Sequence, residues 1–411
     1  MAVINFEKAF LKDNPFAGTP AGPGEEIIWA AMTAPKEQIT NRILNSLATS
    51  PYSLILNWGP WGGGKTHAAK YFTQQKILDD LSEQAVVPSP LSHVVTIPRN
   101  AKDIVRDIYL ALMSYLGIQK IGEDLSRVAE NLGERFDPLV RTFTGDEELA
   151  QALLLLAGRK IVAKGKQEKL LDESDGQIST ELRRYFLLSA GNPELNSLGL
   201  VRKIENSNDQ IKILSAIYNL LLYSREITPL YSEIIIWFDE VEEILSLPGK
   251  QQVILTGLIR DFTDYVPSNL TMFLNFTPRT GGRFEDLSAY LSPAVWDRVR
   301  DQIYFDYFDE LQIKQYISEL LNNPKYRLEG LERTQANLYF PFTADAVEVL
   351  TASLMSKATP RTINEVCSMV IERALAAELL ETPDSPINGE FIGTIEKEIN
   401  SITTRGKISP R

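Results

Sequence analysis

Short runs of apolar residues alternate along the first part of the chain with longer segments in which apolar residues recur every three or four positions. The runs lie at 52–57, 93–97, 234–238 and 270–276. Each run is short and nearly free of polar residues, which is typical of a strand covered on both faces. Strands that alternate with helices predict an α/β fold with a parallel sheet.

Amphipathic spacing predicts helices in the segments between and after these runs. In the first part of the chain the helical patterns lie within 25–49, 102–115, 147–163, 208–223 and 251–265. After about Phe308 the apolar runs stop, and helical patterns follow at 309–321, 343–356 and 360–378. The chain is therefore predicted to carry an α/β core followed by a small all-helical module.

These elements divide the chain into parts with different roles in the predicted fold. In order they are an N-terminal arm with helices of the core (1–50), the P-loop α/β core (51–116 and 230–308), a helical subdomain inserted into that core (117–229), a helical lid (309–380) and a C-terminal tail (381–411). The insertion is far longer than a connection between two core elements needs.

A glycine-rich loop joins the first predicted strand to the helix that follows it. Its residues fit the pattern G-x-x-x-x-G-K-[ST] and precede a histidine: Gly59, Pro60, Trp61, Gly62, Gly63, Gly64, Lys65, Thr66 and His67. Glycines let backbone N–H groups converge on phosphate oxygens, and the helix adds its positive end. Lys65 is expected to reach the β- and γ-phosphates of ATP, and the Thr66 hydroxyl to ligate Mg²⁺.

Two acids end the third apolar run, since Asp239 and Glu240 follow Phe238. In a parallel sheet the carboxyl ends of the strands face the ligand crevice. Asp239 is expected to hold Mg²⁺ through its waters, and Glu240 to orient the water that attacks the γ-phosphate. On its own this pattern equally describes a solvated strand end, and the loop upstream favours the catalytic interpretation. Glu242 and Glu243 are expected on a solvated helix face.

The glycine-rich loop resembles the form Gly-Pro-Pro-Gly-Thr-Gly-Lys-Thr of AAA+ ATPases and departs from it only at Trp61 and Gly63. The two tryptophans at the loop, Trp58 and Trp61, are expected to pack against neighbouring elements. Members of this family place a polar residue that senses the γ-phosphate at the end of the strand after the acidic one. The resemblance implies this role for Asn275, with Thr277 as the alternative.

The same resemblance implies two arginines at the site. The stretch SPAVWDRVR is similar to the region of the family's arginine finger, which reaches the nucleotide of a neighbouring subunit, and it offers Arg298 first and Arg300 second. The lid of the family carries a second sensor, an arginine that opens a helix. Arg361 matches it, because Thr359 suits an N-cap and Pro360 a first turn. Without the resemblance, Arg298 and Arg361 are equally typical of surface arginines.

Within AAA+ the chain resembles most the branch of origin-recognition and replication-initiator ATPases and transposition regulators. Asn14-Pro15-Phe16 and Lys36-Glu37-Gln38 match the N-terminal signature of that branch, and the resemblance covers 14–116 and 230–378. The insertion at 117–229 departs from it. About thirty residues follow the lid, too few for the winged-helix module that origin-recognition proteins use on DNA, so autonomous sequence-specific DNA binding is not expected.

The composition limits which partners the chain is expected to bind and in which cellular compartment it is expected to lie. The formal net charge is −12, so charge does not support binding to nucleic acid. The single cysteine, Cys367, excludes an intramolecular disulfide and a thiolate-rich zinc site, and two histidines are too few for a histidine-rich metal site. No apolar stretch is long enough to span a membrane, and the N-terminus lacks a signal-peptide core, which predicts a cytoplasmic protein.

The motifs together predict an oligomeric ATPase that uses ATP and Mg²⁺ to drive assembly on, or remodelling of, a protein or DNA partner. Two alternatives stay open: a nucleotide-gated switch or scaffold with little hydrolysis, and an ATP-dependent factor for DNA loading or target selection. An arginine finger that acts in trans implies a homo-oligomer, and no membrane partner is expected. The inserted subdomain also carries a basic cluster, which could contact phosphates but is more typical of a solvated helix face. Its residues are Arg159, Lys160, Lys164, Lys166 and Lys169.

Overall fold

The computed structural model describes most of the chain: 5–17, 26–159, 178–278, 288, 291–330, 334, 337–355, 357–380 and 385–404. The chain divides into two compact units. Unit 1 consists of Met1–Glu37, Trp58–Tyr71 and Tyr304–Arg411, and unit 2 consists of Gln38–Asn57 and Phe72–Ile303. Four lysines of the predicted basic cluster, at 160, 164, 166 and 169, lie outside the described residues.

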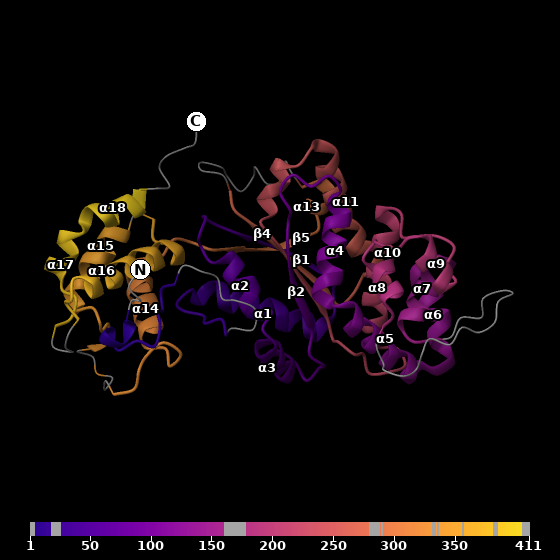
Figure 1. The fold of residues 1–411 in the computed structure, drawn as a ribbon, viewed down its shortest axis with the longest axis horizontal. Helices are drawn as coiled ribbons and strands as arrows, with labels where there is room; N and C mark the ends of the chain where they lie inside the picture. The colour runs from indigo at the N-terminus through magenta and orange to yellow at the C-terminus, as the bar shows by residue number, and fades with distance from the viewer. Residues whose placement is uncertain are drawn as a thin grey trace. The chain divides into compact units, whose positions relative to one another are not determined.

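A five-stranded sheet with the strand order β2-β3-β4-β1-β5 lies almost wholly in unit 2 (Figure 1). The strands are β1 (Ser53–Trp58), β2 (Leu91–Thr96), β3 (Ile234–Asp239), β4 (Leu270–Phe276) and β5 (Val299–Tyr304). The pairs β2–β3 and β3–β4 are parallel, with Leu91 opposite Ile234 and Ile234 opposite Leu270. Every residue of β3 and β4 is buried, as expected for central strands. The predicted α/β fold with a parallel sheet is confirmed.

Strand β5 is one that the apolar runs do not predict. It lies at an edge of the sheet beside β1, and Ile303 is its one buried residue. An edge strand is paired on one side only, and natural proteins often place charges on it to prevent further pairing. The sequence VRDQIY therefore carries no continuous apolar signal. Arg300 lies within this strand.

The helices that belong wholly to unit 2 include those predicted at 102–115, 147–163, 208–223 and 251–265. They are α3 (Gln75–Ala85), α4 (Ile104–Leu116), α5 (Ile118–Leu132), η2 (Gly133–Arg135), α6 (Phe136–Thr144), α7 (Glu147–Leu156), α8 (Thr180–Phe186), α9 (Asn192–Leu198), α10 (Ser207–Leu221), η3 (Val241–Ser246), α11 (Gly249–Tyr265) and α13 (Pro293–Trp296). Helix α1 (Thr33–Thr49) begins in unit 1 and ends in unit 2.

Helix α7 ends earlier than the predicted 147–163. Gly158 adopts a left-handed φ of 73°, and the N–H of Arg159 donates to the Leu154 carbonyl at 2.9 Å. This arrangement closes the last turn and satisfies carbonyl groups that a helix end leaves open. The segment 160–163 lies outside the described residues.

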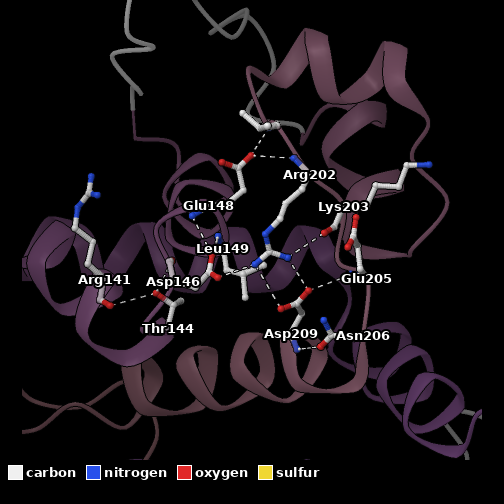
Figure 2. Close-up of polar contacts among 11 residues, drawn as sticks. Arg141, Thr144, Asp146, Glu148, Leu149, Arg202, Lys203, Glu205, Asn206 and Asp209 are labelled. Atoms are coloured by element: carbon white, nitrogen blue, oxygen red, sulfur yellow. Dashed lines mark hydrogen bonds and ion pairs between the residues drawn. The ribbon is translucent and has the colours of Figure 1, made fainter.

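Arg202 ties together three parts of the inserted helical segment (Figure 2). Its guanidinium donates to Asp146 and to Asp209, in each case at 2.7 Å. Asp146 caps α7, and Glu148 accepts from the backbone N–H of Arg202 at 3.3 Å. Burial alone would raise the pKa of Asp146, but the N–H of Leu149 and the guanidinium outweigh it and lower that pKa. The loop before α10 is thereby held against α7.

Helix α10 attaches the insertion to the core within unit 2, since it packs on α4 and α11. Its Tyr218 hydroxyl lies 3.0 Å from Nε2 of His93 on β2, and both side chains are buried. Burial lowers the pKa of His93 to about 3, so this histidine stays neutral at neutral pH. His93 is thus a packed core residue that forms a polar link between sheet and insertion.

A buried carboxyl group lies at the start of β3. Glu233 is fully buried, and its Oε1 accepts hydrogen bonds from the hydroxyls of Ser46, at 2.5 Å, and Thr271. Its Oε2 has no hydrogen-bond partner among the described residues. Burial raises the pKa of Glu233 to about 7, although the two hydroxyls oppose the rise. A carboxyl with an ordinary pKa of 4.5 therefore binds its proton more tightly in the folded chain.

This raised pKa predicts a pH-dependent stability that Glu233→Gln removes. Because the folded state holds the proton more tightly, the stability that Glu233 contributes is complete below about pH 4.5 and is lost as the pH rises to about 7. Each pKa unit corresponds to about 1.4 kcal/mol. We therefore expect the free energy of unfolding of the variant, relative to wild type, to rise by about 3 kcal/mol between pH 4.5 and pH 8.

Urea unfolding of both proteins across this pH range measures the difference. Glu130→Gln is the matched control for the loss of one carboxyl group, because Glu130 is exposed on α5 and lacks the burial that raises the pKa of Glu233. A Glu233→Gln difference that stays constant from pH 4.5 to pH 8 would contradict the assignment of a protonated carboxyl at this position.

Unit 1 combines the glycine-rich loop, the N-terminal arm and the C-terminal helices, which are orange and yellow in Figure 1. Its helices are η1 (Phe6–Ala9), α2 (Lys65–Tyr71), α14 (Glu310–Leu321), α15 (Ala344–Leu354), α16 (Pro360–Ala376), α17 (Gly389–Thr394) and α18 (Glu396–Thr404). The predicted tail at 381–411 thus includes two helices. Helix α17 packs on α15, and α18 packs on α16.

The N-terminal arm is anchored on helix α16 of the lid. The Asn14 amide donates to the Ser368 hydroxyl at 2.7 Å, and Asn14 Oδ1 accepts from the N–H of Phe16 at 2.9 Å. Phe16 is fully buried. The Asn-Pro-Phe segment therefore has a structural role within unit 1. No helix in the described part of the chain is long and apolar enough to cross a membrane.

Candidate functional site

The glycine-rich loop directly follows β1 and leads into α2, as the motif requires. Gly59 has a φ of 152°, and a Cβ at this position would lie 2.2 Å from the backbone oxygen of Phe305. The N–H of Phe305 in turn donates to the Trp58 carbonyl at 2.8 Å. A side chain at position 59 would collide with backbone that is itself held in place. Glycine is therefore required here by packing.

Lys65 is buried at the end of this loop, with an exposed fraction of 6%. Its ammonium group donates to the carbonyls of Gly59 and Pro60, each at 2.9 Å. A buried ammonium needs such acceptors to offset its lost hydration. The predicted phosphate-binding lysine is thus held inside the loop that carries it, and Thr66 beside it is exposed.

His67 faces the N-terminal segment of unit 1. Its ring centroid lies 5.9 Å from that of Trp29. Burial lowers the pKa of His67 to about 4, the Ile28 backbone opposes this change, and the charge of Lys70 adds to it. The imidazole is therefore neutral at neutral pH and brings no positive charge to the loop.

A row of three hydrogen-bonded side chains crosses the sheet of unit 2. Asn57 of β1 donates to Asn275 Oδ1 of β4 at 2.9 Å, and Asn275 donates to Asp239 Oδ1 of β3 at 3.0 Å. All three side chains are buried. The strands β3, β4 and β1 are neighbours in the sheet, so the row spans three adjacent strands. Asn275, predicted as a sensor, therefore lies beside Asp239, predicted as a metal ligand.

Glu240 follows β3 with an unusual backbone conformation. Its φ is 56° and its ψ is 42°, in the left-handed region that few non-glycine residues adopt. Such strain is common at functional sites. The Glu240 carboxylate, 44% exposed, lies 3.9 Å from the guanidinium of Arg99, which also pairs with Glu243 at 2.9 Å. Arg99, in the loop after β2, is a residue that the motifs do not reveal.

The two acids after Glu240 do not lie on a solvated helix face, so that prediction was wrong. Glu242 accepts from the backbone N–H of Thr277 at 3.0 Å, and Glu243 pairs with Arg99. Both side chains are partly buried in the short 3₁₀ helix η3. Thr277 is joined to Glu242 through its backbone N–H, whereas the Asn275 side chain is hydrogen-bonded to Asp239.

The predicted finger arginines lie in different surroundings. The Arg298 guanidinium donates to the Ala294 carbonyl at 2.7 Å and to the carboxylate of Asp264 on α11 at 2.9 Å. The Arg300 guanidinium lies over the Tyr52 ring at 5.2 Å from its centroid and is exposed. Arg298 is therefore engaged by its own chain in this structure.

Arg361 is the second residue of α16, as the Thr-Pro-Arg sequence predicts. Thr359 accepts from the N–H of Thr362 and caps the helix. The Arg361 guanidinium lies 3.9 Å from the centroid of the Trp61 ring. Trp58 packs on Tyr304 at 4.4 Å between ring centroids, but Trp61 is 67% exposed. The expectation that both tryptophans pack against neighbouring elements was therefore wrong for Trp61.

The predicted residues fall into two groups within the described parts of the chain. Unit 1 holds the whole glycine-rich loop together with Arg361, and unit 2 holds Asp239, Glu240 and Asn275. Two polar residues complete the second group without having been predicted, Asn57 and Arg99. Both occur near the carboxyl end of a strand, and that position alone is the signal which points to them.

The site belongs to a parallel-sheet P-loop fold. Neither a protein-family model nor a curated protein sequence matches the chain. Among solved structures, it is similar to the ORC2 protein of Aeropyrum pernix, with 11% identity over 98% of this chain and 73% of that chain and a TM-score of 0.46.

It is also similar to Cdc6p from Pyrobaculum aerophilum, with 11% identity over 95% of this chain and 72% of that chain and a TM-score of 0.47. A third similar structure is the ORC1 protein of Aeropyrum pernix in complex with DNA, with 14% identity over 95% of this chain and 70% of that chain and a TM-score of 0.43.

Proposed function

We propose that this chain binds ATP with Mg²⁺ and hydrolyses it, as an ATPase of the AAA+ type. The observation that supports the proposal most is the buried row Asn57–Asn275–Asp239. It joins the acid at the end of β3 to a residue only two positions before the glycine-rich loop. Burying a row of polar side chains inside an apolar sheet destabilises the fold unless every side chain is hydrogen-bonded or binds a ligand. A bound triphosphate and its metal ion would be such a ligand.

In this proposal the loop binds the phosphates. The backbone N–H groups of residues 61–66 surround the β-phosphate, and Lys65 exchanges its carbonyl acceptors for phosphate oxygens. Charge-assisted hydrogen bonds to phosphate are stronger than those to neutral carbonyls, so the exchange favours the nucleotide. Neutral His67 supports the loop through its backbone and its packing.

The residues also fit Mg²⁺, which supplies charge neutralisation at the phosphates when bound. Thr66 and Asp239 offer a hydroxyl and a carboxylate, the hard oxygen ligands that this ion prefers. Mg²⁺ at phosphates takes only one or two protein ligands and keeps its waters.

Glu240 is proposed to orient the attacking water and to accept its hydrogen bond. Its strained backbone aims the carboxylate differently from a regular continuation of β3, and Arg99 sets its position from the side. Asn275 is proposed to sense the γ-phosphate beside Asp239. Arg361 is proposed to contact the same phosphate from the first turn of α16.

Arg298 is proposed to act on the nucleotide of a neighbouring copy of the chain. Hydrolysis then requires a homo-oligomer, so turnover per subunit should rise cooperatively with protein concentration. We expect Arg298→Ala to bind ATP normally but to lose this rise, with turnover lowered about 10³-fold or more, in the range found for arginine fingers. Steady-state ATPase activity measured over a concentration series tests this.

Arg260→Ala is the matched control, because Arg260 also reaches Asp264, at 3.9 Å, and is 48% exposed. It should keep the wild-type dependence on concentration. If Arg298→Ala behaves like wild type, Arg298 is not the finger, and the same series on Arg300→Ala tests the second candidate. Flat and negligible turnover of the wild-type protein at every concentration would instead favour a nucleotide-gated switch.

The energy of hydrolysis is proposed to drive assembly on, or remodelling of, a protein or DNA partner in the cytoplasm. DNA loading or target selection is the form of this proposal in which the partner is DNA. Gel-shift experiments with ATP and with ADP over a salt series separate the two forms, because contacts to phosphates weaken steeply as salt rises. If the protein shifts DNA with neither ATP nor ADP, the proposal with DNA as the partner is ruled out and the one with a protein partner remains.

A further inference from the structure

The first turn of helix α16 lies directly against the glycine-rich loop within unit 1. The backbone N–H of Arg361 donates to the Gly62 carbonyl at 3.4 Å. A Cβ on Gly62 would lie 2.8 Å from the Arg361 Cβ and 3.0 Å from the Thr359 hydroxyl, and Gly62 has a φ of 76°. Glycine is therefore required both by the left-handed backbone and by the approach of the helix. The loop and the first turn of α16 form one packed element.

Trp61, the neighbour of Gly62, is exposed and carries a cation on one face. Its exposed fraction is 67%, although an indole gains much from burial. The Arg361 guanidinium lies over the ring at 3.9 Å from its centroid, and it is also 3.4 Å from Glu365. Both contacts are open to solvent, which weakens them. Arg361 is thus held beside the loop by contacts that a multiply charged anion can replace.

We propose that Trp61 is the positioning residue for Arg361: the ring holds the guanidinium beside the loop, and the γ-phosphate of bound ATP draws it off the ring. This inference rests on the proposed function, because it needs a triphosphate at residues 59–66. Charge-assisted hydrogen bonds from a guanidinium to phosphate are stronger than a cation–π contact in water. ADP has no γ-phosphate, so ADP leaves the stack in place.

The stack competes with the γ-phosphate for Arg361. The cation–π contact stabilises the chain without nucleotide and with ADP, whereas the ATP-bound chain has given that contact up. Trp61 therefore lowers the affinity for ATP relative to ADP. Its side chain acts through Arg361 and does not touch the nucleotide.

Tryptophan fluorescence measures the movement directly, because the emission of an indole changes when a charged group leaves its face. The chain has five tryptophans, so the emission of Trp61 is obtained as the difference between wild type and Trp61→Phe. We expect this difference to change with a slowly hydrolysed ATP analogue and Mg²⁺, to stay constant with ADP, and to be insensitive to nucleotide in Arg361→Gln.

Calorimetric titration of nucleotide on the same samples tests the role of Trp61 separately from the proposed binding of ATP. Constant emission from Trp61 while the analogue is bound would overturn the role of Trp61 and leave the proposed function standing. A wild-type protein that takes up no ATP would overturn both. A change that ADP produces equally would also contradict the inference, because it would not depend on the third phosphate.

Affinities of variants give a second, independent test. Trp61→Leu removes the aromatic face, and because Trp61 is exposed, the core is untouched. We expect it to raise the affinity for ATP relative to ADP by about two- to fivefold, the effect of losing one exposed cation–π contact, whereas Trp61→Phe keeps an aromatic face and should change this ratio less. In the Arg361→Gln background, Trp61→Leu should leave the ratio unchanged, since both substitutions remove the same contact.

Arg373→Gln provides the matched control on the same helix. Arg373 lies near the other end of α16 and pairs with Glu398 at 2.8 Å, with an exposed fraction of 56%. Its loss should leave the ratio of ATP to ADP affinity unchanged. A wild-type ratio in Trp61→Leu, or an equal effect of Trp61→Leu in the wild-type and Arg361→Gln backgrounds, would contradict the inference.

Discussion

Replacing Glu240 by glutamine is expected to lower the rate of ATP hydrolysis by about 10²–10⁴-fold, the usual contribution of a positioned general base. Glutamine keeps the size of the side chain but cannot accept a proton from the attacking water. The variant should still bind ATP with wild-type affinity, because Glu240 interacts with the water and not with the phosphates in the ground state. Single-turnover hydrolysis together with calorimetric titration of ATP measures both quantities.

Glu243→Gln is the matched control for this experiment. Glu243 lies three positions further along and pairs with the same Arg99, at 2.9 Å. If Glu240 has the proposed role, the control should keep most of its turnover, since its carboxylate supports Arg99 only. Hydrolysis at the wild-type rate in Glu240→Gln would rule out a role for this residue as the base.

Replacing Lys65 by alanine is expected to abolish tight ATP binding. The ammonium is buried and lies within the loop, and a hydrogen bond to a charged group contributes about 1.5–3 kcal/mol. With one or two such bonds to phosphate, the dissociation constant for ATP should rise at least about 10- to 100-fold. Calorimetric titration of ATP in the presence of Mg²⁺ measures the change.

Lys70→Ala is the matched control for Lys65, because it lies on the same helix α2 and removes the same charge. It should bind ATP almost as wild type does. Thermal unfolding of both variants shows whether the loop is still folded, since Lys65 also bonds the Gly59 and Pro60 carbonyls. Equal ATP affinities for wild type and for a folded Lys65→Ala protein would contradict the phosphate-binding role.

Some parts of this fold can be predicted from the sequence because one local residue pattern is enough to identify the element. The continuous apolar runs of β3 and β4 predict central strands, and both strands are fully buried. The sequence Thr-Pro-Arg predicts the start of α16 because the N-cap and the first turn have strong local preferences. In these segments the local preference and the tertiary structure agree.

Other parts depend on neighbours that a local pattern does not contain. Strand β5 is stable because β1 pairs with it, and its own sequence is charged. Arg99 meets Glu240 only because the loops after β2 and β3 lie side by side. A tryptophan is usually a packing residue, but Trp61 is exposed and its partner Arg361 comes from a helix 300 positions later. Such pairs follow from topology, and spacing along the chain does not encode them.

A structure of the chain with a slowly hydrolysed ATP analogue and Mg²⁺ tests the proposed site most directly. We expect one triphosphate in the loop at 59–66. We also expect one metal ion about 2.1 Å from the Thr66 hydroxyl, the usual Mg²⁺–oxygen distance, with the Asp239 carboxylate reaching that ion directly or through a bound water. A nucleotide bound elsewhere, or a metal ion that Asp239 does not reach even through a water, would contradict the proposed site.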